Sequence, residues 1–387
     1  PSIIKISTTI GYGSPNKSDT AGIHGAAIGA EEAELTRDFL NWEYPPFEIP
    51  KEVYDHFKKA ISRGEAAENS WNDKFNQYKN AFPKEGAELE RMLKGELPNN
   101  WEKDLPSYKP EDKGLATRKH SQICLGALGP NIPELIGGSA DLTHSNYTDI
   151  KGESGSFQAS SPEKRYLHFG VREHAMAAIL NGIAYHNSGL IPYGGTFLVF
   201  ADYMRGSMRL SALSGLGVIY VLTHDSIGVG EDGPTHQPVE HLASLRAIPN
   251  LTVIRPSDII ETIEAWQYAL ESQSPCVIVL TRQNLPMLRT NNKINIVERG
   301  AYPIIDFENY HGTILATGSE VEIACESSKI LSSENINIRV ISFPSWEIFD
   351  KKSKKEKMEI LGNKLLFAIE AGAVNGWEKY VSNENFI

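Results

Sequence analysis

Short runs of apolar residues alternate with longer segments of helical periodicity through the middle of the chain. Three runs rich in β-branched residues predict strands: Glu134–Gly138, Val218–Thr223 and Cys276–Thr281. Helical patterns separate them at Thr117–Leu128, His174–Asn187, Tyr203–Leu213 and Ile259–Leu270. Strands without polar alternation that are separated by helices are typical of a sheet buried on both faces. Residues from about 115 to 290 therefore predict an α/β fold with a doubly wound, mostly parallel sheet.

The same alternation returns towards the end of the chain. Strands are predicted at 313–317, 338–342 and 365–370, with a helix at 320–331. Three strands make a thin sheet to stand alone. We therefore expect a partial second α/β domain, cut at Ile387.

The first hundred residues have a different pattern. A short strand is predicted at Ile3–Ile6, and a charged helical pattern follows from Glu31 to about Gly95, broken at prolines. A stretch rich in proline and charge, 97–110, resembles a linker. We predict a helical remnant with its linker at 1–95, a sheet domain at 96–292 and the partial domain at 293–387.

The negative net charge of the chain limits which classes of molecule it could bind. The chain has 38 Lys and Arg against 49 Asp and Glu, a formal net charge of −11. This acidity argues against nucleic acid or an anionic membrane as a partner. No apolar run approaches the length of a membrane span, and the three cysteines show no disulfide spacing. We expect a protein of a reducing compartment, the cytoplasm.

Glu173 lies in the phrase Gly170-Val171-Arg172-Glu173-His174, directly before a helical pattern. A carboxylate in the first turn of a helix is favoured by the helix dipole, which explains the residue without any function. Alternatively, Glu173 is held in an apolar pocket and hydrogen-bonds a ring nitrogen of a cofactor. Burial would raise its pKa and let it move a proton. The residues alone leave both interpretations open.

Three aromatic residues, Phe197, Phe200 and Tyr203, recur at spacings of three, which resembles a helix. Such a stripe most often belongs to a core. The two glycines before it, Gly194 and Gly195, would also let the backbone approach a flat ligand. The stripe by itself is weak evidence for a site.

The loop at 224–238 carries more specific signals. It leaves the end of a predicted strand, where ligands bind in open α/β sheets. It contains His224, Asp232 and His236 between glycines and prolines. The acidic series of a calcium loop, the ligand spacing of a zinc site and the third glycine of a dinucleotide fingerprint are missing from it. A sugar or sugar phosphate, bound by neutral His donors and an Asp acceptor, suits these residues.

Two arginines are candidates for binding phosphate. Arg118 and Arg282 each follow a threonine, and the second comes right after a predicted strand. A guanidinium matches phosphate oxygens with two hydrogen bonds, although most arginines are solvated surface charges. Ser145 is a candidate for an additional hydroxyl.

These phrases together resemble the transketolase family, in the same order and with similar gaps, over essentially the whole chain. The loop at 224–238 and the phrase Gly137-Gly138-Ser139-Ala140-Asp141-Leu142-Thr143 are the specific parts. The triplet Arg172-Glu173-His174 is shared more widely among thiamine-diphosphate enzymes.

The resemblance implies a role for each candidate residue in binding thiamine diphosphate. Glu173 would bind the aminopyrimidine ring and promote the tautomer that generates the reactive ylid. Phe200 would stack on that ring with Phe197 and Tyr203 beside it, and Asp141 would support the pocket.

The resemblance also implies substrates, and with them the pentose phosphate pathway. A two-carbon ketol unit would pass from a ketose phosphate such as xylulose 5-phosphate to an aldose phosphate such as ribose 5-phosphate. His24, His224 and His236 would surround the reacting end of the sugar, and Asp232 would contact the acceptor's C2 hydroxyl. Four residues would hold the phosphate: Arg118, Ser145, His224 and Arg282.

Two departures from the family pattern matter. Ala27 stands where the family has a proline three residues after His24, which would make that loop less rigid. The Gly-Asp-Gly and Asn metal motif of the diphosphate-binding domain is missing from the sequence, which begins at Pro1. We therefore expect no metal ligands in this chain, Mg²⁺ (or Ca²⁺) being held by the missing N-terminal part. The family's active site lies between the two subunits of a homodimer.

Three other assignments remain open, and a fourth, a deoxyxylulose-phosphate synthase, is less favoured. A dihydroxyacetone synthase uses the same loop, although the phosphate-binding candidates favour a sugar-phosphate acceptor. A deoxyxylulose-phosphate synthase lacks the loop phrase. An inactive pyrimidine-binding and dimerisation fragment, or a split enzyme completed by a second chain, would keep these residues without turnover by this chain alone.

Overall fold

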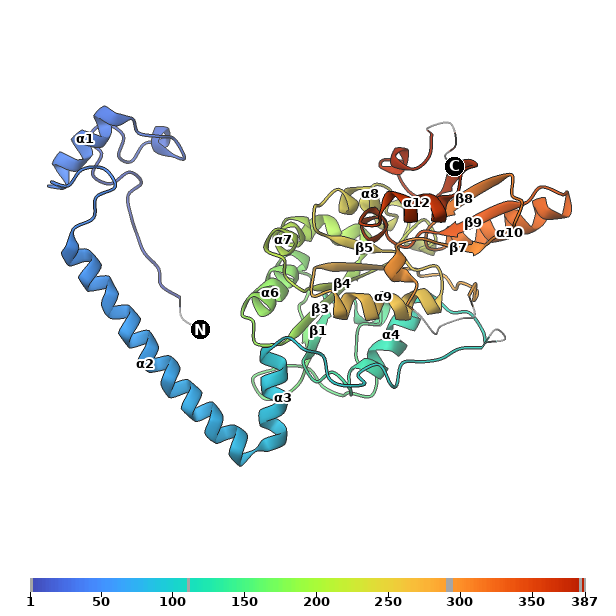
Figure 1. Ribbon diagram of the computed structural model, residues 1–387, viewed down its shortest axis with the longest axis horizontal. Helices are drawn as coiled ribbons and strands as arrows, with labels where there is room; N and C mark the ends of the chain where they lie inside the picture. Colours follow the sequence, from blue (N-terminus) through green and yellow to red (C-terminus); the bar gives the residue numbers. More distant parts are fainter. Residues whose placement is uncertain (1–2, 110–111, 290–294, 383–384, 386–387) are drawn as a thin grey trace. The chain divides into compact units, whose positions relative to one another are not determined.

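The computed structural model describes residues 3–109, 112–289, 295–382 and 385. They form two compact units, residues 1–86 and 87–387 (Figure 1). The predicted boundary at 293 lies outside the described residues. No helix in the described part of the chain is both long and apolar enough to cross a membrane.

The first unit is helical. It contains the short 3-10 helix η1 (Ala21–Ile23), α1 (Ala30–Phe39) and α2 (Lys51–Ala81), and α3 (Pro83–Leu93) begins in it. The helical pattern and its breaks are confirmed, since Pro50 precedes α2 and Pro83 begins α3, the position that tolerates proline best. The predicted strand at Ile3–Ile6 is wrong, because these residues belong to no strand.

The second unit is built on a six-stranded parallel sheet, as predicted. The strand order is β2-β1-β3-β4-β6-β5. In that order the strands are Tyr166–His168, Leu135–Ser139, Ile191–Phe197, Ile219–Thr223, Cys276–Leu280 and Thr252–Ile254. The prediction missed β2 and β5, which have only three residues each, and β3, which contains a proline and two glycines that weaken a strand pattern.

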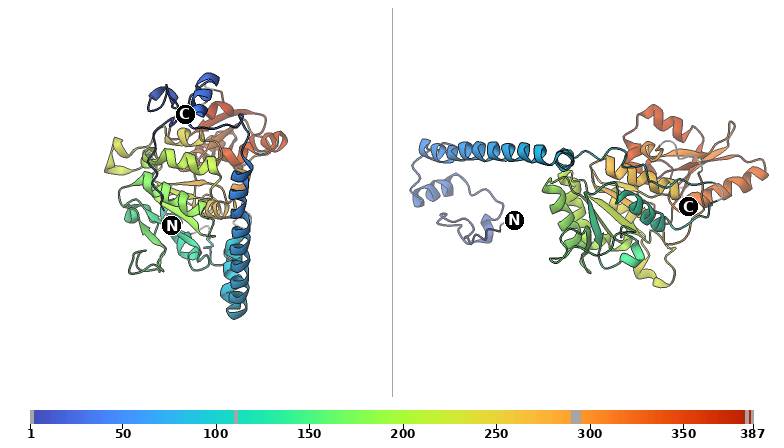
Figure 2. Two further views of the ribbon diagram at one scale, coloured as in Figure 1. Left: turned by 90° about the vertical axis from the view of Figure 1, so that its left-hand side faces the viewer. Right: turned by 90° about the horizontal axis from the view of Figure 1, so that it is seen from below.

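Helices cover both faces of this sheet (Figures 1 and 2). The helices α4 (Thr117–Leu128) and α9 (Ile259–Glu271) share a core with Ile219 and Val221 of β4. The opposite face carries α6 (Glu173–Tyr185), α7 (Ala201–Ser214) and α8 (His241–Arg246), whose core includes Tyr220 and Leu222. Successive residues of one strand therefore enter different cores, which explains why the strand is apolar throughout.

The C-terminal sheet has four strands in the order β10-β8-β9-β7. These are Leu365–Ile369, Gly312–Ala316, Ile338–Ser342 and Tyr302–Ile305. The expectation of three strands was wrong, because β7 was missed; it pairs antiparallel with β9 and completes the sheet. The helices of this part are α10 (Glu320–Ser333), α11 (Trp346–Asp350) and α12 (Lys354–Leu361).

Arg255, which follows β5, connects the two sheets of the second unit. Its side chain is fully buried. Its Nε donates to Asp225 Oδ2 (2.9 Å), its Nη1 donates to Thr317 Oγ1 (2.9 Å), and Nη1 also binds Glu320. A Cβ at Gly318 would lie only 2.6 Å from Arg255 Nε, so a glycine is needed beside the guanidinium. Two carboxylates, one from the loop after β4 and one from the first turn of α10, thus share one buried cation.

A second buried ion pair reinforces this junction. Arg246 Nη2 lies 2.8 Å from Glu370 Oε2, and both side chains are almost fully buried. Burial alone would raise the pKa of Glu370, but Arg246 overcomes that effect and holds the pKa at about 2. Glu370 is therefore charged inside the protein, which requires Arg246 to stay in place.

We predict that Arg255→Met destabilises the second unit strongly. Removing the guanidinium leaves Asp225 and Glu320 buried without their cation, which costs about 3–5 kcal/mol. Urea unfolding monitored by near-UV circular dichroism measures the change. Arg209→Met is the matched control, because Arg209 is exposed on α7 and should change stability by less than about 0.5 kcal/mol. An equal effect of the two substitutions would contradict the structural role of Arg255.

Candidate functional site

Most of the predicted site residues of the second unit lie at or after the carboxyl ends of its parallel strands, while Arg118 lies in the first turn of α4. These ends meet at one edge of the sheet, since Phe197 of β3 pairs with Thr223 of β4, and Thr223 with Leu280 of β6. The strands β1, β2, β3, β4 and β6 lead, respectively, to Asp141 and Ser145, to Glu173, to Phe200, to His224 and to Arg282. Segments far apart in the sequence are thereby brought to the same edge.

Two threonines bring the predicted arginines together. Thr117 N donates to Thr281 Oγ1 (3.1 Å), and Thr281 N donates to Thr117 Oγ1 (2.7 Å). This exchange fixes the first turn of α4 against the end of β6. The residues that follow, Arg118 and Arg282, are close enough for each charge to lower the pKa of a common neighbour, His224.

The Arg118 guanidinium is oriented by several contacts. Nη1 donates to the main-chain oxygen of Ser145 (2.6 Å) and lies 3.4 Å from His224 Nε2. The guanidinium carbon lies 5.2 Å from the centre of the Tyr147 ring. Burial lowers the pKa of Arg118, and the Asp232 carboxylate acts in the opposite direction. Ser145 thus contributes a carbonyl oxygen to the arginine.

Arg282 is the more exposed member of the pair. Its Nη2 lies 3.8 Å from Glu231 Oε2, a contact between partly exposed side chains that contributes little. A Cβ at Gly230 would lie 3.3 Å from the Arg282 guanidinium. The glycine therefore lets the loop at 224–238 pass close to this cation.

His224 is held in an unusual conformation directly after β4. Its φ of 61° lies in the left-handed region, which costs a non-glycine residue about 1–3 kcal/mol. Its ring stacks on Phe197 with centroids 3.8 Å apart. Burial lowers the pKa of His224 to about 3, and the charges of Arg118 and Arg282 add to the effect. His224 is therefore a neutral imidazole at physiological pH.

The aromatic residues form a cluster with His236. The rings of Phe197 and Phe200 lie 5.6 Å apart and nearly parallel, at 8°. The ring of His236 lies 5.4 Å from that of Phe200, and the ring of Tyr203, which is largely exposed, lies 5.9 Å from it. The helical interpretation of this stripe was wrong for Phe197, which ends β3, while Phe200 ends the 3-10 helix η2 (Leu198–Phe200). The change from strand to helix turns these rings towards one another.

Glu173 and Asp141 occupy different environments. Glu173 is the first residue of α6, so the helix begins one residue earlier than predicted, and only 7% of Glu173 is exposed. A nearly buried carboxylate at a helix N-terminus can accept a hydrogen bond from a ring nitrogen. Asp141 has a φ of 62°, is exposed, and lies just before α5 (Thr143–Asn146).

His24 belongs to the first unit. It follows η1 and is exposed. Its predicted role at the reacting end of a sugar remains a prediction.

Among the described residues, one group has the geometry to hold a metal ion. It comprises Asp202, Glu240 and His241, whose ligand atoms lie within 4.8 Å of one another. Both carboxylates are exposed, and His241 Nε2 already lies 3.2 Å from Asp202 Oδ2. None of the three is a predicted site residue.

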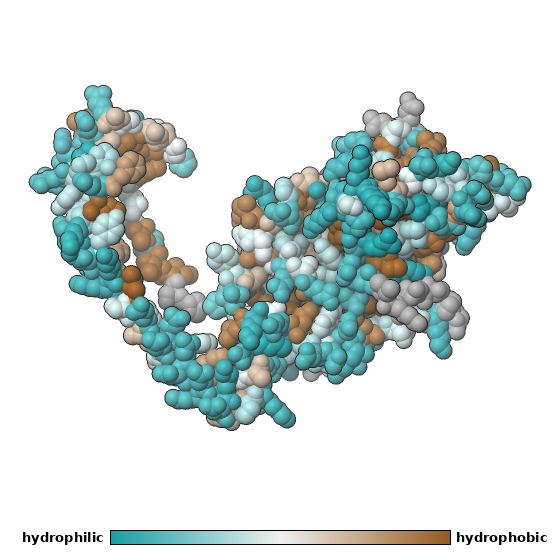
Figure 3. All heavy atoms as spheres, in the orientation of Figure 1, coloured by the Kyte–Doolittle hydropathy of each residue, from teal (hydrophilic) through white to brown (hydrophobic). Residues whose placement is uncertain are grey.

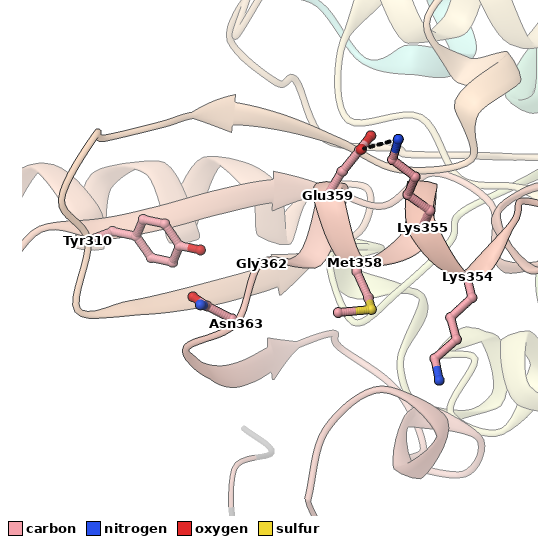
Figure 4. A pocket seen from close by; sticks show the side chains of 7 residues that line it. All are labelled: Tyr310, Lys354, Lys355, Met358, Glu359, Gly362 and Asn363. Carbon is pink, nitrogen blue, oxygen red and sulfur yellow. Dashed lines mark ion pairs between the residues drawn. The ribbon is translucent and has the colours of Figure 1, made fainter.

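One hollow of the C-terminal part involves none of these residues. It has a volume of about 630 Å³ and is lined by residues of α12 and its neighbours (Figure 4), namely Tyr310, Lys354, Lys355, Met358, Glu359, Gly362 and Asn363. It contains no predicted site residue, and its lining offers mainly hydrocarbon. The chemistry of the sheet edge, rather than cavity size, therefore identifies the candidate site.

Comparisons with known proteins agree with this geometry. Residues 113–287 match the transketolase pyrimidine-binding domain, residues 1–98 match the transketolase thiamine diphosphate-binding domain, and residues 300–387 match the transketolase-like C-terminal domain. A chloroplastic transketolase from Craterostigma plantagineum is 50% identical over 99% of this chain, which covers 75% of that protein. The chain belongs to the transketolase family. The resemblance to this family that the sequence showed is therefore confirmed.

Other relatives are longer than this chain. The transketolase of a Nostoc species is 52% identical over 99% of the chain, which spans 58% of that protein. A Pichia stipitis transketolase structure in complex with sedoheptulose 7-phosphate superposes with a TM-score of 0.91 at 43% identity, over 97% of this chain and 56% of that one. The chain thus spans a little over half the length of several transketolases that it resembles.

A more distant similarity involves a divided family member. A split-gene transketolase described as an inactive β4 tetramer has a TM-score of 0.56 at 28% identity, covering 68% of this chain and 82% of that one. At least one divided member of the transketolase family is therefore inactive as the β4 tetramer whose structure is known.

Sequence reasoning missed the residues that support the site. Thr117 and Thr281 were quoted only as neighbours of the arginines, although the repeated Thr-Arg pair was a usable signal. Tyr147 and Asn146 gave no signal, because their roles depend on contacts across the sheet. Asp225 and Arg255 were also missed for this reason.

We predict that His224 titrates near pH 3 and that Arg118→Met moves this midpoint towards 6.5, because one of the cations that oppose protonation is lost. NMR of ¹⁵N-histidine-labelled protein measures the midpoint. Between pH 6.5 and 3 the unfolded chain takes up a proton that the folded chain does not, so this histidine makes stability fall as pH decreases. Arg299→Met, at an exposed position, should leave the midpoint unchanged. A midpoint near 6.5 in the unaltered chain would contradict the buried, cation-flanked environment.

Proposed function

We propose that this chain contains the pyrimidine-binding part of a transketolase, which transfers a two-carbon ketol unit from a ketose phosphate to an aldose phosphate. The observation that carries the proposal is the juxtaposition of Arg118 and Arg282 beside neutral His224 at the sheet edge. Two guanidinium groups in one place suit a phosphate dianion. The sugar phosphate held by the Pichia stipitis relative supports the same class of substrate.

The remaining polar residues fit the carbon chain of a sugar. His236 lies beside the rings of Phe197 and Phe200, and the charge of Asp232 acts on Arg118. We assign His236, and His24 by family resemblance, to the reacting end of the sugar, and Asp232 to a hydroxyl of the acceptor. Arg118 and Arg282, with Ser145 and His224 beside them, form the phosphate end.

The carboxylate and the aromatic rings at this edge of the sheet fit thiamine diphosphate. Glu173 offers a nearly buried carboxylate to a pyrimidine nitrogen, and the parallel rings of Phe197 and Phe200 offer flat faces to its ring. Thiamine diphosphate supplies the carbanion chemistry that breaks a bond beside a carbonyl. Glu173 would hold and move a proton at the ring nitrogen, while Tyr203 and Asp141 border the pocket.

We propose three domains at 1–95, 96–292 and 293–387, supported by the three family matches. The metal, Mg²⁺ or Ca²⁺, and the diphosphate would be held by residues outside this sequence, in a homodimer whose active sites lie between subunits. The first unit exposes large apolar side chains, among them Ile4, Phe47 and Phe57, and brown apolar surface covers part of it (Figure 3). Exposed apolar surface of this kind supports a covering partner. The buried free cysteines fit a reducing, cytoplasmic location.

Two alternatives remain, and a specific observation supports one of them. An inactive or split arrangement is supported by similarity to the inactive split-gene family member. A dihydroxyacetone synthase would use the same loop with an acceptor that has no phosphate. The paired arginines favour the sugar phosphate.

We predict that Arg282→Met raises KM for ribose 5-phosphate by tenfold or more in the assembled enzyme and barely affects KM for ribose. The lost charge-assisted hydrogen bonds involve only the phosphate. Steady-state kinetics with both acceptors measure this difference. Arg299→Met, at an exposed position, is the control. An equal effect on both acceptors would assign Arg282 to a structural role and favour a non-phosphorylated acceptor.

We also predict no ketol transfer from xylulose 5-phosphate to ribose 5-phosphate by this chain alone, with thiamine diphosphate and magnesium supplied. Adding the N-terminal part of a transketolase should restore turnover, and Glu173→Gln should then reduce kcat about 10²–10⁴-fold. Glu163→Gln, at an exposed position, should match the unaltered chain. Turnover by the chain alone would refute the need for the diphosphate part, and no turnover in any mixture would favour the inactive fragment.

A further inference from the structure

We propose that Asp202, Glu240 and His241 form a binding site for a divalent transition-metal ion, and that Zn²⁺ is the ion that suits these ligands best. Asp202 lies in the first turn of α7, Glu240 directly precedes α8, and His241 is the first residue of α8. The proposal goes beyond the proposed function, because it requires neither the sugar phosphate nor thiamine diphosphate.

The three side chains lie at distances that one ion can span. Nε2 of His241 is 3.2 Å from Asp202 Oδ2. Two atoms that each lie about 2.0–2.2 Å from the same zinc ion are about 2.8–3.6 Å apart in regular coordination, so this separation already suits a shared ion. The ligand atoms of all three residues lie within 4.8 Å of one another. A small rotation of the exposed Glu240 carboxylate would complete the set.

His241 is the fixed member of the group. Its side chain is only 5% exposed. Within the described part of the chain its Nδ1 is buried and has no hydrogen-bond partner, since the Glu240 carboxylate oxygen beside it is 3.9 Å away. A buried polar atom without a partner is rare and calls for an explanation. The protein leaves part of the bonding capacity of this imidazole unused, next to two carboxylates.

Each ring nitrogen of His241 has a carboxylate beside it, Asp202 at Nε2 and Glu240 at Nδ1. A neutral imidazole has one N–H and one lone pair, so only one nitrogen can donate to a carboxylate. The lone pair of the other nitrogen is left beside a negative charge. A metal ion removes this conflict, because it binds the lone pair and carboxylate oxygens together. The remaining N–H keeps a carboxylate beside it, as is usual for a metal-binding histidine.

The types of ligand select among metal ions. An imidazole nitrogen suits zinc and neighbouring transition metals, whereas Mg²⁺ and Ca²⁺ prefer sites made of oxygen atoms. The side chains of Asp202 and Glu240 are 58% and 65% exposed, so solvent reaches the group. Three protein ligands and a water molecule are a common coordination of zinc. We therefore expect one Zn²⁺ per chain, with water at the open position.

Simpler explanations account for only part of this arrangement. The dipole of α7 stabilises a carboxylate in its first turn, which explains Asp202 without any ion. Arg205, one turn further along α7, directs its Nη1 to the main-chain and hydroxyl oxygens of Ser244 (2.8 and 3.0 Å), so this nitrogen does not neutralise the carboxylates. Neither feature explains why a second carboxylate and an unpartnered imidazole nitrogen lie beside Asp202.

A bound ion would connect two segments that border the candidate site. Asp202 lies between Phe200 and Tyr203 in the sequence, and Glu240 comes two residues after the loop at 224–238. The ring of His236, in that loop, already lies 5.4 Å from the ring of Phe200. The ion would thus hold the end of the loop against the helix that carries Tyr203. We expect the loop to be more ordered when the ion is bound.

Calorimetry with the metal-free chain and ZnCl₂ at pH 7 tests the site. We expect one Zn²⁺ per chain, with binding about 10–100-fold weaker in Asp202→Asn and in Glu240→Gln. Both substitutions are at exposed positions and should leave the fold intact. Glu163→Gln, which removes an exposed carboxylate elsewhere, is the matched control and should bind Zn²⁺ as the unaltered chain does. MgCl₂ should bind at least tenfold more weakly than ZnCl₂.

A spectroscopic measurement tests the role of the imidazole. In ¹⁵N-histidine-labelled chain, Zn²⁺ should shift a ring nitrogen of His241 in the unaltered chain and in Glu163→Gln, and much less in Glu240→Gln at the same concentration. His241→Gln assigns the signal. The proposal is overturned if Zn²⁺ does not bind, if both carboxylate variants bind it unchanged, or if Mg²⁺ binds equally well. The group would then be an ordinary histidine flanked by two carboxylates.

Hydrogen exchange tests the consequence for the loop. With Zn²⁺ present, the amides of residues 224–240 should exchange more slowly in the unaltered chain and in Glu163→Gln, but not in Asp202→Asn. An exchange rate that does not change when Zn²⁺ binds would overturn the connection between the ion and the loop. None of these measurements requires turnover, so their outcome is independent of whether the proposed ketol transfer is correct.

Discussion

The second unit depends on one buried cation. Arg255 lies between two carboxylates: Asp225, in the loop that follows β4 of the six-stranded sheet, and Glu320, the first residue of α10 in the C-terminal part. A buried guanidinium is tolerated only when its charge is paired and most of its N–H groups donate hydrogen bonds. Here Thr317 and Ser319 accept the hydrogen bonds that the two carboxylates do not. The cation therefore specifies how the two sheets pack.

The functional edge follows from the parallel sheet. Every strand of that sheet ends at the same side, so five separate segments supply side chains without any long loop reaching across. The paired hydrogen bonds between Thr117 of α4 and Thr281, which follows β6, bring the positive charges of Arg118 and Arg282 close together. The sheet alone would not do this. The repulsion between the two guanidinium groups is offset by neighbouring polar groups, including the Ser145 carbonyl and the Asp232 carboxylate.

Much of the fold was predictable because it is encoded locally. The helix at Thr117–Leu128 was predicted with the bounds that the structure has, and β4 and β6 were located to within a residue at each end. The failures have physical causes. Strands of three residues give too short a pattern, β3 is interrupted by Pro192 and two glycines, and the antiparallel β7 is defined by its neighbour β9.

The sequence identified the candidate site residues but not the residues that hold them in position. Chemistry-bearing side chains such as His224 and Arg282 could be recognised by type, loop position and family resemblance. The groups that orient them could not, because Asn146 and Thr223 are 77 positions apart and meet only after the sheet has formed. The change from strand to 3-10 helix between Phe197 and Phe200 likewise depends on packing rather than on the spacing of aromatic residues.

The backbone turn at His224 has a consequence for the order of assembly. With φ at 61°, the chain directs His224 towards the sheet edge and its neighbour Asp225 towards Arg255. A strained residue keeps its conformation only while its neighbours hold it. Asp225 is held by the Arg255 guanidinium, which also binds Glu320 of α10, in the part of the chain that is made later. We therefore expect the imidazole to reach its final position last, after the C-terminal sheet has docked, so that a nascent chain holds the elements of the site before it can recognise a ligand.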